Sequence, residues 1–331
     1  MKAGSLLRAL RNSFVPLFIL ASVSTTAGAS YSQVVFFGDS LTDTGNLYAS
    51  SGGTVPLSPP YYNGRFSNGP LWSESLAGAL GFAATPSLFG GGNFAWAGAT
   101  VVDYGRPQPE IPQELGQYFA RSGGVADSSA LYVILGGAND INDAGKNPAT
   151  AVSNVIKAAL AIDGMVEALY AAGARNILVG NLPDIGLTPQ AVAGGPAVVA
   201  GASALTKVFN ATLQSLLASS EVADAHLDLD LLDLYGLMGS VVADPSAFGF
   251  SNVTDPCKSG SVGGPGSVCA SPGSYLFWDA FHPSARAHEL IAEAALRELP
   301  EPAGAMLLVA ALLALLRSGT SRRGSEVART A

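Results

Sequence analysis

Short apolar runs that each lead into a glycine constrain the fold of this 331-residue chain more than any other feature. The three clearest runs are VVFF at 34–37, ALYVIL at 130–135 and RNILV at 175–179. Runs of this length and composition are typical of strands buried on both faces of a parallel sheet. Segments with helical spacing of apolar residues lie at 149–172, 201–219 and 284–299. The alternation predicts an α/β fold in which helices cover a mainly parallel sheet.

The rest of the central region fits one domain over residues 30–299. The segment 226–238 alternates like a strand and then tightens to helical spacing, and Ser284 stands where it can cap the last helix. No internal repeat or linker divides the region. Stretches rich in glycine and proline lie at 50–70, 89–112 and 244–275, where we expect long loops around a site.

Charge limits the class of partner. Residues 30–300 carry ten Lys or Arg and 23 Asp or Glu, a formal charge of −13. A surface this acidic repels nucleic acid and anionic lipid head groups. We therefore expect no nucleic-acid partner.

The N-terminus has the three-part layout of a secretory signal peptide. Lys2, Arg8 and Arg11 precede an apolar stretch at 14–23, and small residues follow up to Ala29. We expect cleavage after Ala29, so that residues 1–29 are the signal peptide. A retained N-terminal anchor is the alternative, although the apolar stretch is short for a membrane span. The pattern predicts export to the periplasm, the cell surface or the medium.

The C-terminus has a second tripartite pattern. Pro300-Glu301-Pro302 precede 14 apolar residues at 303–316 and a group of arginines that ends at Arg323. Residues 300–323 resemble the PEP-CTERM sorting signal, a bacterial tail processed by an exosortase, but here a polar tail (324–331) follows. The resemblance implies an exosortase-type partner and membrane contact through the apolar segment. An ordinary short tail anchor is the alternative.

The two cysteines, Cys257 and Cys269, lie in the Gly/Ser-rich stretch CKSGSVGGPGSVC. In an exported chain this spacing predicts one disulfide that closes a short loop. No histidine or acidic cluster lies beside them in the sequence, so a metal site is not indicated.

Ser40 stands at the carboxyl end of the first apolar run, in GDSLTDTGN. Ligands bind at this edge of open α/β sheets. The serine is therefore a candidate nucleophile, while the alternative is that Asp39 or Ser40 caps the next helix. A nucleophilic serine needs a base, and the base needs a partner that fixes its tautomer.

Three histidines are available as the base. His226 opens an acidic, strand-like segment and is expected at a surface or edge, whereas His288 lies within the last helix as a packed or solvated residue. His282, in FWDAFHPSA, occupies a loop at a helix start, and Asp279 three residues earlier is placed to accept its Nδ1 proton. The alternative is that Asp279 and His282 form only a local turn.

Two residues are candidates to stabilise an oxyanion. Asn139 in GGAND follows a buried strand and offers a side-chain amide, and Gly98 in NFAWAGAT offers a backbone N–H that a substrate can approach closely. The alternatives are an Asx turn for Asn139 and a simple positive-φ position for Gly98.

The blocks GDSLTDTGN, NFAWAGAT, GGAND and DAFHP, in this order, resemble those of the GDSL esterase/lipase family, the SGNH hydrolases. The stretch NLPDIGLTP at 181–189 is also similar to a segment of that family. The resemblance implies a flavodoxin-like three-layer α/β/α sandwich. It also implies Ser40 as nucleophile and oxyanion donor, Gly98 and Asn139 as further donors, and Asp279 with His282 as the activating dyad. The departure is at Gly98, where Ala97 replaces a first glycine.

The resulting hypothesis is an exported serine esterase or lipase that works through an acyl-enzyme and needs no metal or organic cofactor. A carbohydrate O-acetylesterase acting on envelope or exopolysaccharide is one alternative. A non-catalytic surface binding protein is the other. Four aromatic residues, Tyr61, Tyr62, Trp72 and Trp96, are candidates either for a substrate pocket or for the core.

Overall fold

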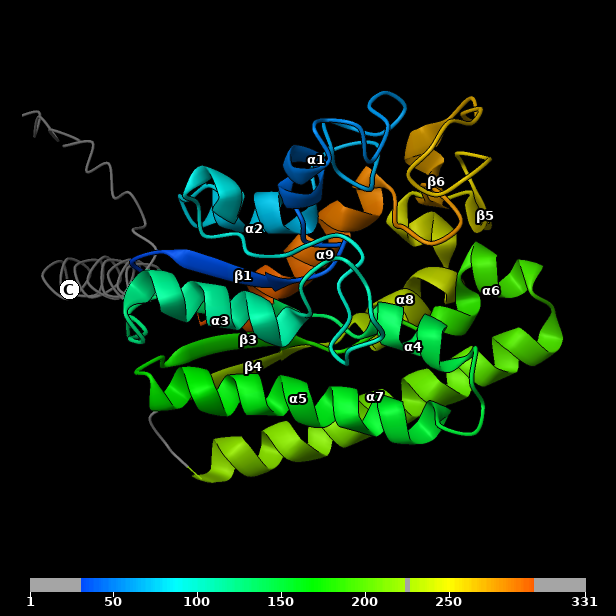
Figure 1. Cartoon of the computed structure of the whole chain (residues 1–331). Helices are drawn as coiled ribbons and strands as arrows, with labels where there is room; N and C mark the ends of the chain where they lie inside the picture. Colours follow the sequence, from blue (N-terminus) through cyan, green and yellow to red (C-terminus); the bar gives the residue numbers. More distant parts are fainter. Residues whose placement is uncertain (1–30, 224–226, 301–331) are drawn as a thin grey trace, which may run out of the picture.

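A computed structural model describes residues 31–223 and 227–300 (Figure 1). The predicted signal peptide, the apolar C-terminal segment with the polar tail, and His226 lie outside the described residues. The strands are β1 (Val34–Gly38), β2 (Leu131–Leu135), β3 (Asn176–Gly180), β4 (Asp228–Leu232), β5 (Asn252–Pro256) and β6 (Tyr275–Phe277). The α-helices are α1 (Asn46–Ser50), α2 (Trp72–Ala79), α3 (Ile111–Ser122), α4 (Ala138–Ala144), α5 (Ala151–Ala171), α6 (Pro189–Ala193), α7 (Pro196–Ala223), α8 (Leu234–Ala243) and α9 (Ala285–Glu298). Within this part of the chain, no helix combines the length and apolarity needed to span a bilayer.

The main sheet contains four parallel strands in the order β1-β2-β3-β4. The segment 92–96 continues the hydrogen bonding along the other edge of β1: the N–H of Phe36 donates to the carbonyl of Gly92 (2.9 Å), and the N–H of Phe94 donates to the carbonyl of Phe36 (2.8 Å). With this segment counted, the chain order across the sheet is 2-1-3-4-5, as in flavodoxin-like folds. The order of the chain changes direction beside β1, which is where such folds bind ligands.

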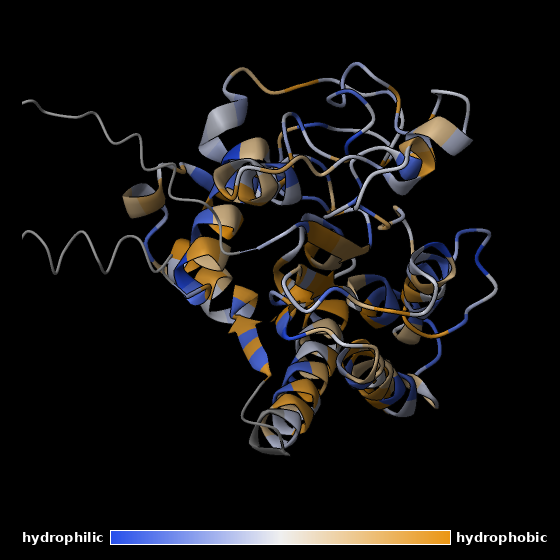
Figure 2. Cartoon of the chain, turned by 90° about the vertical axis from the view of Figure 1, so that its left-hand side faces the viewer, coloured by the Kyte–Doolittle hydropathy of each residue, from blue (hydrophilic) through white to orange (hydrophobic). Residues whose placement is uncertain are grey.

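Helices cover both faces of the sheet. On one face α3, α5 and α7 pack on alternate residues of the strands, such as Phe37 and Ile134. On the other face α2 and α9 pack on the intervening residues, such as Phe36 and Val133. Figure 1 shows these two helical layers, and Figure 2 shows hydrophobic residues concentrated on the central strands. The predicted three-layer α/β/α sandwich is confirmed.

Local sequence explains the predicted helices. In α7 the side chains of Phe209, Leu213 and Leu217 recur every four residues and are buried in the core. Helix α9 begins after Ser284, whose hydroxyl accepts the N–H of Ala287 at 3.4 Å.

One predicted loop needs correction: the stretch 244–275 contains strand β5 and two short 3-10 helices. Helix α2 and the body of α3 lie outside the predicted loops and were not expected. Strand β5 pairs in parallel with β6, which begins about 20 residues later in the sequence. This pairing depends on a contact between distant segments, which the glycine and proline content did not reveal.

Candidate active site

Ser40 lies just past the end of β1, in a turn that tight packing fixes. A Cβ at Gly38 would lie 2.4 Å from the carbonyl oxygen of Leu135 on β2, so only glycine fits there. The next helix, α1, begins at Asn46 with Gly45 as its N-cap. Ser40 therefore does not cap a helix, and its largely buried side chain is available at the sheet edge.

The loop between β6 and α9 brings His282 to Ser40. The Nε2 atom of His282 lies 2.8 Å from the Oγ of Ser40, although the two residues are 242 positions apart in the sequence. The Nδ1 atom of His282 lies 3.0 and 2.9 Å from the two carboxylate oxygens of Asp279. Asp279 and His282 also form a local turn, because the carboxylate of Asp279 accepts the backbone N–H of His282 at 2.7 Å. One carboxylate thus fixes both the loop and the imidazole.

The carboxylate of Asp279 is fully buried yet ionised. Burial by itself opposes ionisation, but the His282 ring and several hydrogen bonds outweigh it and lower the pKa of Asp279 to about 2. One of these bonds comes from the hydroxyl of Tyr61, which donates to Oδ2 at 2.6 Å. The ring of Phe66 covers the imidazole, with the ring centroids 4.8 Å apart.

Asn139 and Gly98 lie in neighbouring backbone segments. The side-chain amide of Asn139, in the first turn of α4, donates to the carbonyl of Ala99 at 2.9 Å, and its second N–H bond is free to point elsewhere. Gly98 has a φ of +89°, which favours glycine. In residues 31–223 and 227–300, no backbone hydrogen bond uses the N–H of Ser40 or of Gly98.

Comparison with known proteins decides the family. The sequence profile of GDSL-like Lipase/Acylhydrolase proteins matches residues 34–295. The chain belongs to the GDSL lipase/acylhydrolase family. It is therefore a serine hydrolase that acts on esters, and the non-catalytic alternative is set aside.

Three relatives found by sequence comparison support this assignment. Phosphatidylcholine-sterol acyltransferase of Aeromonas hydrophila is 32% identical over 259 residues, which cover 75% of this chain and 72% of the relative. A GDSL esterase/lipase of Arabidopsis thaliana is 28% identical, with 78% and 84% covered. Lipase 1 of Photorhabdus luminescens is 28% identical over 89% of this chain, which spans about half (54%) of that relative. A solved lipolytic G-D-S-L protein from Veillonella parvula aligns over 80% of this chain and 96% of its own, at 14% identity and a TM-score of 0.43.

Buried carboxylates hold the GDSL turn and the NFAWAGAT segment together. Asp43 accepts the N–H groups of Gly45 (2.7 Å) and Ala97 (2.8 Å). Glu114 on α3 accepts those of Gly38 (2.8 Å) and Trp96 (3.0 Å). Glu114 therefore ties a residue two positions before Ser40 to a residue two positions before Gly98.

A third carboxylate, Asp140, accepts the N–H groups of Val101 (2.8 Å) and Val102 (2.9 Å). Burial raises the pKa of Asp140 to about 7 and that of Asp39 to about 6, and it raises the pKa of Glu114 well above its ordinary value. The sequence analysis named Asp39 only as a possible helix cap and did not single out Asp43, Asp140 or Glu114. Asp39, Asp43 and Asp140 lie inside the sequence blocks GDSLTDTGN and GGAND, so membership of these blocks could have pointed to them. Glu114 lies outside all of the blocks.

Two cavities are lined by sequence neighbours of the site residues, although Ser40, Asp279 and His282 themselves line neither. An apolar pocket of ≈ 70 Å³ is lined by Leu41 and Pro283, the sequence neighbours of Ser40 and His282, and by apolar side chains such as Met238. A groove of ≈ 620 Å³ extends along α4, α6 and α7. Both cavities share Ile185, Thr188 and Phe281.

The aromatic candidates and His288 take no part in the contacts that join Ser40, His282 and Asp279 to one another. Tyr61 and Trp72 are buried, and none of the four aromatic candidates lines either cavity. His288 is a packed helix residue whose Nδ1 accepts the N–H of Trp72 at 3.3 Å. Burial, with a smaller effect of His282, lowers the pKa of His288 to about 3. Within the described ranges, no group of three or more His, Cys, Asp or Glu residues could hold a metal ion.

Proposed function

We propose that this protein is an exported carboxylesterase or lipase with Ser40 as nucleophile, His282 as base and Asp279 as its orienting carboxylate. The observation that carries the proposal is the continuous chain of contacts from Ser40 Oγ to His282 Nε2 and from His282 Nδ1 to Asp279. This arrangement supplies the base and tautomer control that a serine nucleophile requires.

The reaction has two halves. In the first, His282 takes the proton of Ser40 as its oxygen attacks the ester carbonyl, and then gives that proton to the leaving alcohol. In the second, His282 deprotonates a water that attacks the acyl-enzyme, and then returns that proton to the oxygen of Ser40 as the bond to the acyl group breaks and the acid leaves. Asp279 stabilises the imidazolium in both halves. The N–H groups of Ser40 and Gly98 and the amide of Asn139 are the proposed donors to the oxyanion.

The cavities favour an acyl group longer than acetyl. The small pocket beside Leu41 and Pro283 is lined almost entirely by apolar side chains, and the adjoining groove is also mainly apolar. An acetylated sugar would leave most of this apolar surface unused, whereas a longer hydrocarbon chain would bury it at about 0.8 kcal/mol per methylene.

Export is proposed from the sequence of residues 1–29. The disulfide between Cys257 and Cys269 supports it, because such bonds persist in oxidising compartments. Processing by an exosortase and transient membrane contact through residues 300–323 remain parts of the same proposal.

The test combines hydrolysis with active-site labelling. The purified protein should hydrolyse p-nitrophenyl esters, with kcat/KM rising from acetyl to longer chains, and a fluorophosphonate probe should label Ser40. Ser40→Ala and His282→Ala should each lower kcat by roughly 10⁶-fold. Hydrolysis that survives in Ser40→Ala would reject the nucleophile. Faster release of acetate from acetylated polysaccharide than of any longer acid would favour the O-acetylesterase.

A further inference from the structure

Tyr61 connects the catalytic carboxylate to a distant loop. Its hydroxyl donates to Oδ2 of Asp279 at 2.6 Å and accepts the backbone N–H of Gly263 at 2.8 Å. The side chain is only 2% exposed, so water does not replace either contact. Burial, together with the charge of Asp279, raises the pKa of the Tyr61 phenol, which therefore stays protonated and remains a donor.

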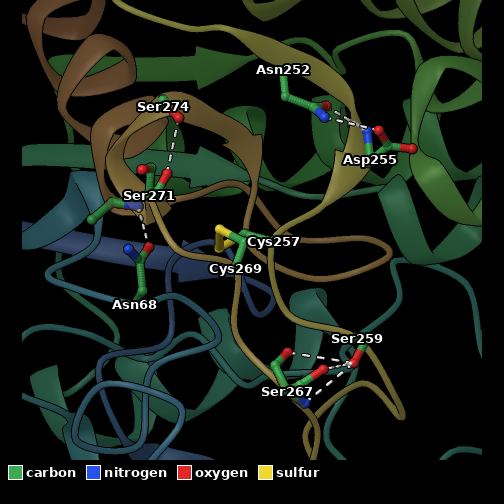
Figure 3. Close-up of a disulfide and its surroundings, with 10 residues drawn as sticks. Asn68, Asn252, Asp255, Cys257, Ser259, Ser267, Cys269, Ser271 and Ser274 are labelled. Atoms are coloured by element: carbon green, nitrogen blue, oxygen red, sulfur yellow. Dashed lines mark hydrogen bonds between the residues drawn. A yellow bond between two sulfur atoms is a disulfide. The ribbon is translucent and has the colours of Figure 1, made fainter.

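Gly263 belongs to the loop that the Cys257–Cys269 disulfide closes (Figure 3). The base of the loop is bound to the active-site segment, because the N–H of Cys257 donates to the carbonyl of Phe277 (3.1 Å) and that of Lys258 to the carbonyl of Trp278 (2.6 Å). The tip is bound to the segment before Tyr61, because the carbonyl of Gly263 accepts the N–H of Leu57 at 2.8 Å. Both ends of the connection are therefore anchored.

The interior of the disulfide loop is organised around one buried cation. Lys258 is 1% exposed, and its ammonium donates to the carbonyls of Ser261 (2.8 Å) and Ser259 (3.0 Å). The same ammonium lies 5.1 Å from the centroid of the Tyr61 ring. Ser259 and Ser267 also pair across the loop, with their hydroxyl oxygens 2.8 Å apart, as Figure 3 shows. A loop this well bonded can hold the Gly263 N–H in a fixed place.

We propose that Tyr61 is a positioning residue for the Asp279–His282 pair and that the disulfide loop holds Tyr61 in place through Gly263. The inference rests on the proposed function, because it assigns Tyr61 a role only if Asp279 and His282 act in catalysis. It goes beyond that function by making turnover depend on a disulfide loop that supplies none of the proposed catalytic residues.

The first test is Tyr61→Phe, which removes the hydroxyl and keeps the ring that packs edge-on against Trp278. We expect kcat to fall about tenfold with KM within about twofold, since the Asp279 carboxylate loses the bond that fixes its orientation toward the imidazole. Tyr62→Phe is the matched control, because Tyr62 is adjacent and 39% exposed. The control should retain the wild-type kcat.

A pH profile of kcat/KM distinguishes a positioning role of the Tyr61 hydroxyl from a simple loss of packing. The groups that face the pair are Tyr61 and Lys258 around Asp279, and Asp39 and His288 around His282. Without the phenol, the Asp279 carboxylate is a stronger acceptor and holds the imidazolium more tightly. The acidic limb of kcat/KM should therefore move to higher pH in Tyr61→Phe, whereas loss of packing alone would lower the rate without moving the limb.

The second test asks whether Tyr61 and the disulfide act through the same connection. The paired variant Cys257→Ser/Cys269→Ser should lower kcat by roughly three- to tenfold, and it should add less than about twofold in the Tyr61→Phe background, because both changes break one connection. Independent, multiplying losses would overturn the link. An unchanged kcat in Tyr61→Phe would overturn the positioning role.

These outcomes are distinguishable from failure of the proposed function. Fluorophosphonate labelling of Ser40 is measured in every variant. An unlabelled wild type rejects the proposed function, whereas a labelled and active wild type with an indifferent Tyr61→Phe rejects only this inference.

Discussion

The Ser40 side and the His282 side of the site are held by buried carboxylates in opposite electrostatic situations. On the Ser40 side, Glu114 and Asp140 accept only backbone N–H groups, and burial raises their pKa values. On the His282 side, Asp279 faces an imidazole and a phenol as well as backbone, and its pKa is lowered to about 2. The two sides differ in the partners of the carboxylate. Asp279 has the imidazole of His282 and the phenol of Tyr61 beside it, whereas Glu114 and Asp140 have only backbone donors.

This difference separates the roles of the carboxylates. Glu114 and Asp140 fix backbone segments near the proposed oxyanion donors, and at neutral pH their burial opposes folding. In the proposed mechanism, Asp279 is matched to an imidazole that becomes positive during turnover. We therefore expect loss of Asp279 to affect mainly the rate, and loss of Asp140 to affect mainly the pH dependence of stability.

The largest predicted effect tests the rate side of this comparison. Asp279→Ala should lower kcat by roughly 10⁴-fold, because the imidazole loses the acceptor that fixes its tautomer and stabilises its charge. The measurement is p-nitrophenyl ester hydrolysis with Ser40→Ala as the blank. A loss of less than tenfold would show that the carboxylate does not orient His282.

A smaller effect is expected at the oxyanion donors. Asn139→Ala should lower kcat by about 10²- to 10³-fold, since it removes one donor and also the bond to the carbonyl of Ala99. Turnover should remain measurable because the N–H groups of Ser40 and Gly98 persist. Full activity in this variant would remove Asn139 from the oxyanion hole.

The sequence predicted the parts of the site whose signal is local. Ser40 follows an apolar run, and His282 precedes a helix cap, so strand ends and cap residues singled them out as candidates. Strands β1, β2 and β3 were likewise found from short apolar runs, and β4 from the alternating segment at 226–238. Helix α2 was missed between two stretches rich in glycine and proline. Helix α3 was missed although its buried residues Ile111, Leu115 and Tyr118 stand at helical spacing, a signal that was available in the sequence.

Contacts between distant segments could not be predicted in the same way. Tyr61 lies 218 residues before Asp279, and nothing near it in the sequence distinguishes a hydroxyl aimed at a carboxylate from an ordinary core aromatic. Glu114 reads as one of several polar residues in a helix, although both its oxygens bind backbone near the site. Such partners depend on how loops pack over the sheet, which local patterns do not encode.

The stability side of the comparison is tested by pH. The pKa of Asp140 is raised from 3.8 to about 7, so the folded state retains its proton longer than the unfolded state. The stability that this proton provides is complete below pH 4 and is lost as the pH rises through 7, by an amount on the order of 4 kcal/mol. Asp140→Asn should flatten the decline in the free energy of unfolding between pH 4 and 7, measured by urea titration.

Asp279 contributes to the pH dependence of stability with the opposite sign and in a different pH range. Its pKa is lowered from 3.8 to about 2, so its contribution is present above pH 4 and is lost as the pH falls through 2. Asp279→Asn should therefore change the stability profile at its acid end, below pH 4, where the raised pKa of Asp140 contributes little slope. Equal changes of slope in both variants would contradict the proposed contrast.

The smallest predicted effect asks whether the His282 side depends on the helix that follows it. Ser284→Ala should lower the free energy of unfolding by about 1 kcal/mol, because the N–H of Ala287 loses its cap, and Ser284→Gly should cost only a few tenths. The kcat should stay within about twofold, since the backbone N–H of Ser284 still donates to the carbonyl of Leu276 (2.9 Å) and keeps the loop in register. Thermal unfolding and p-nitrophenyl ester hydrolysis measure the two effects. If Ser284→Ala instead lowers kcat as much as Tyr61→Phe, helix α9 rather than the disulfide loop sets the position of the imidazole.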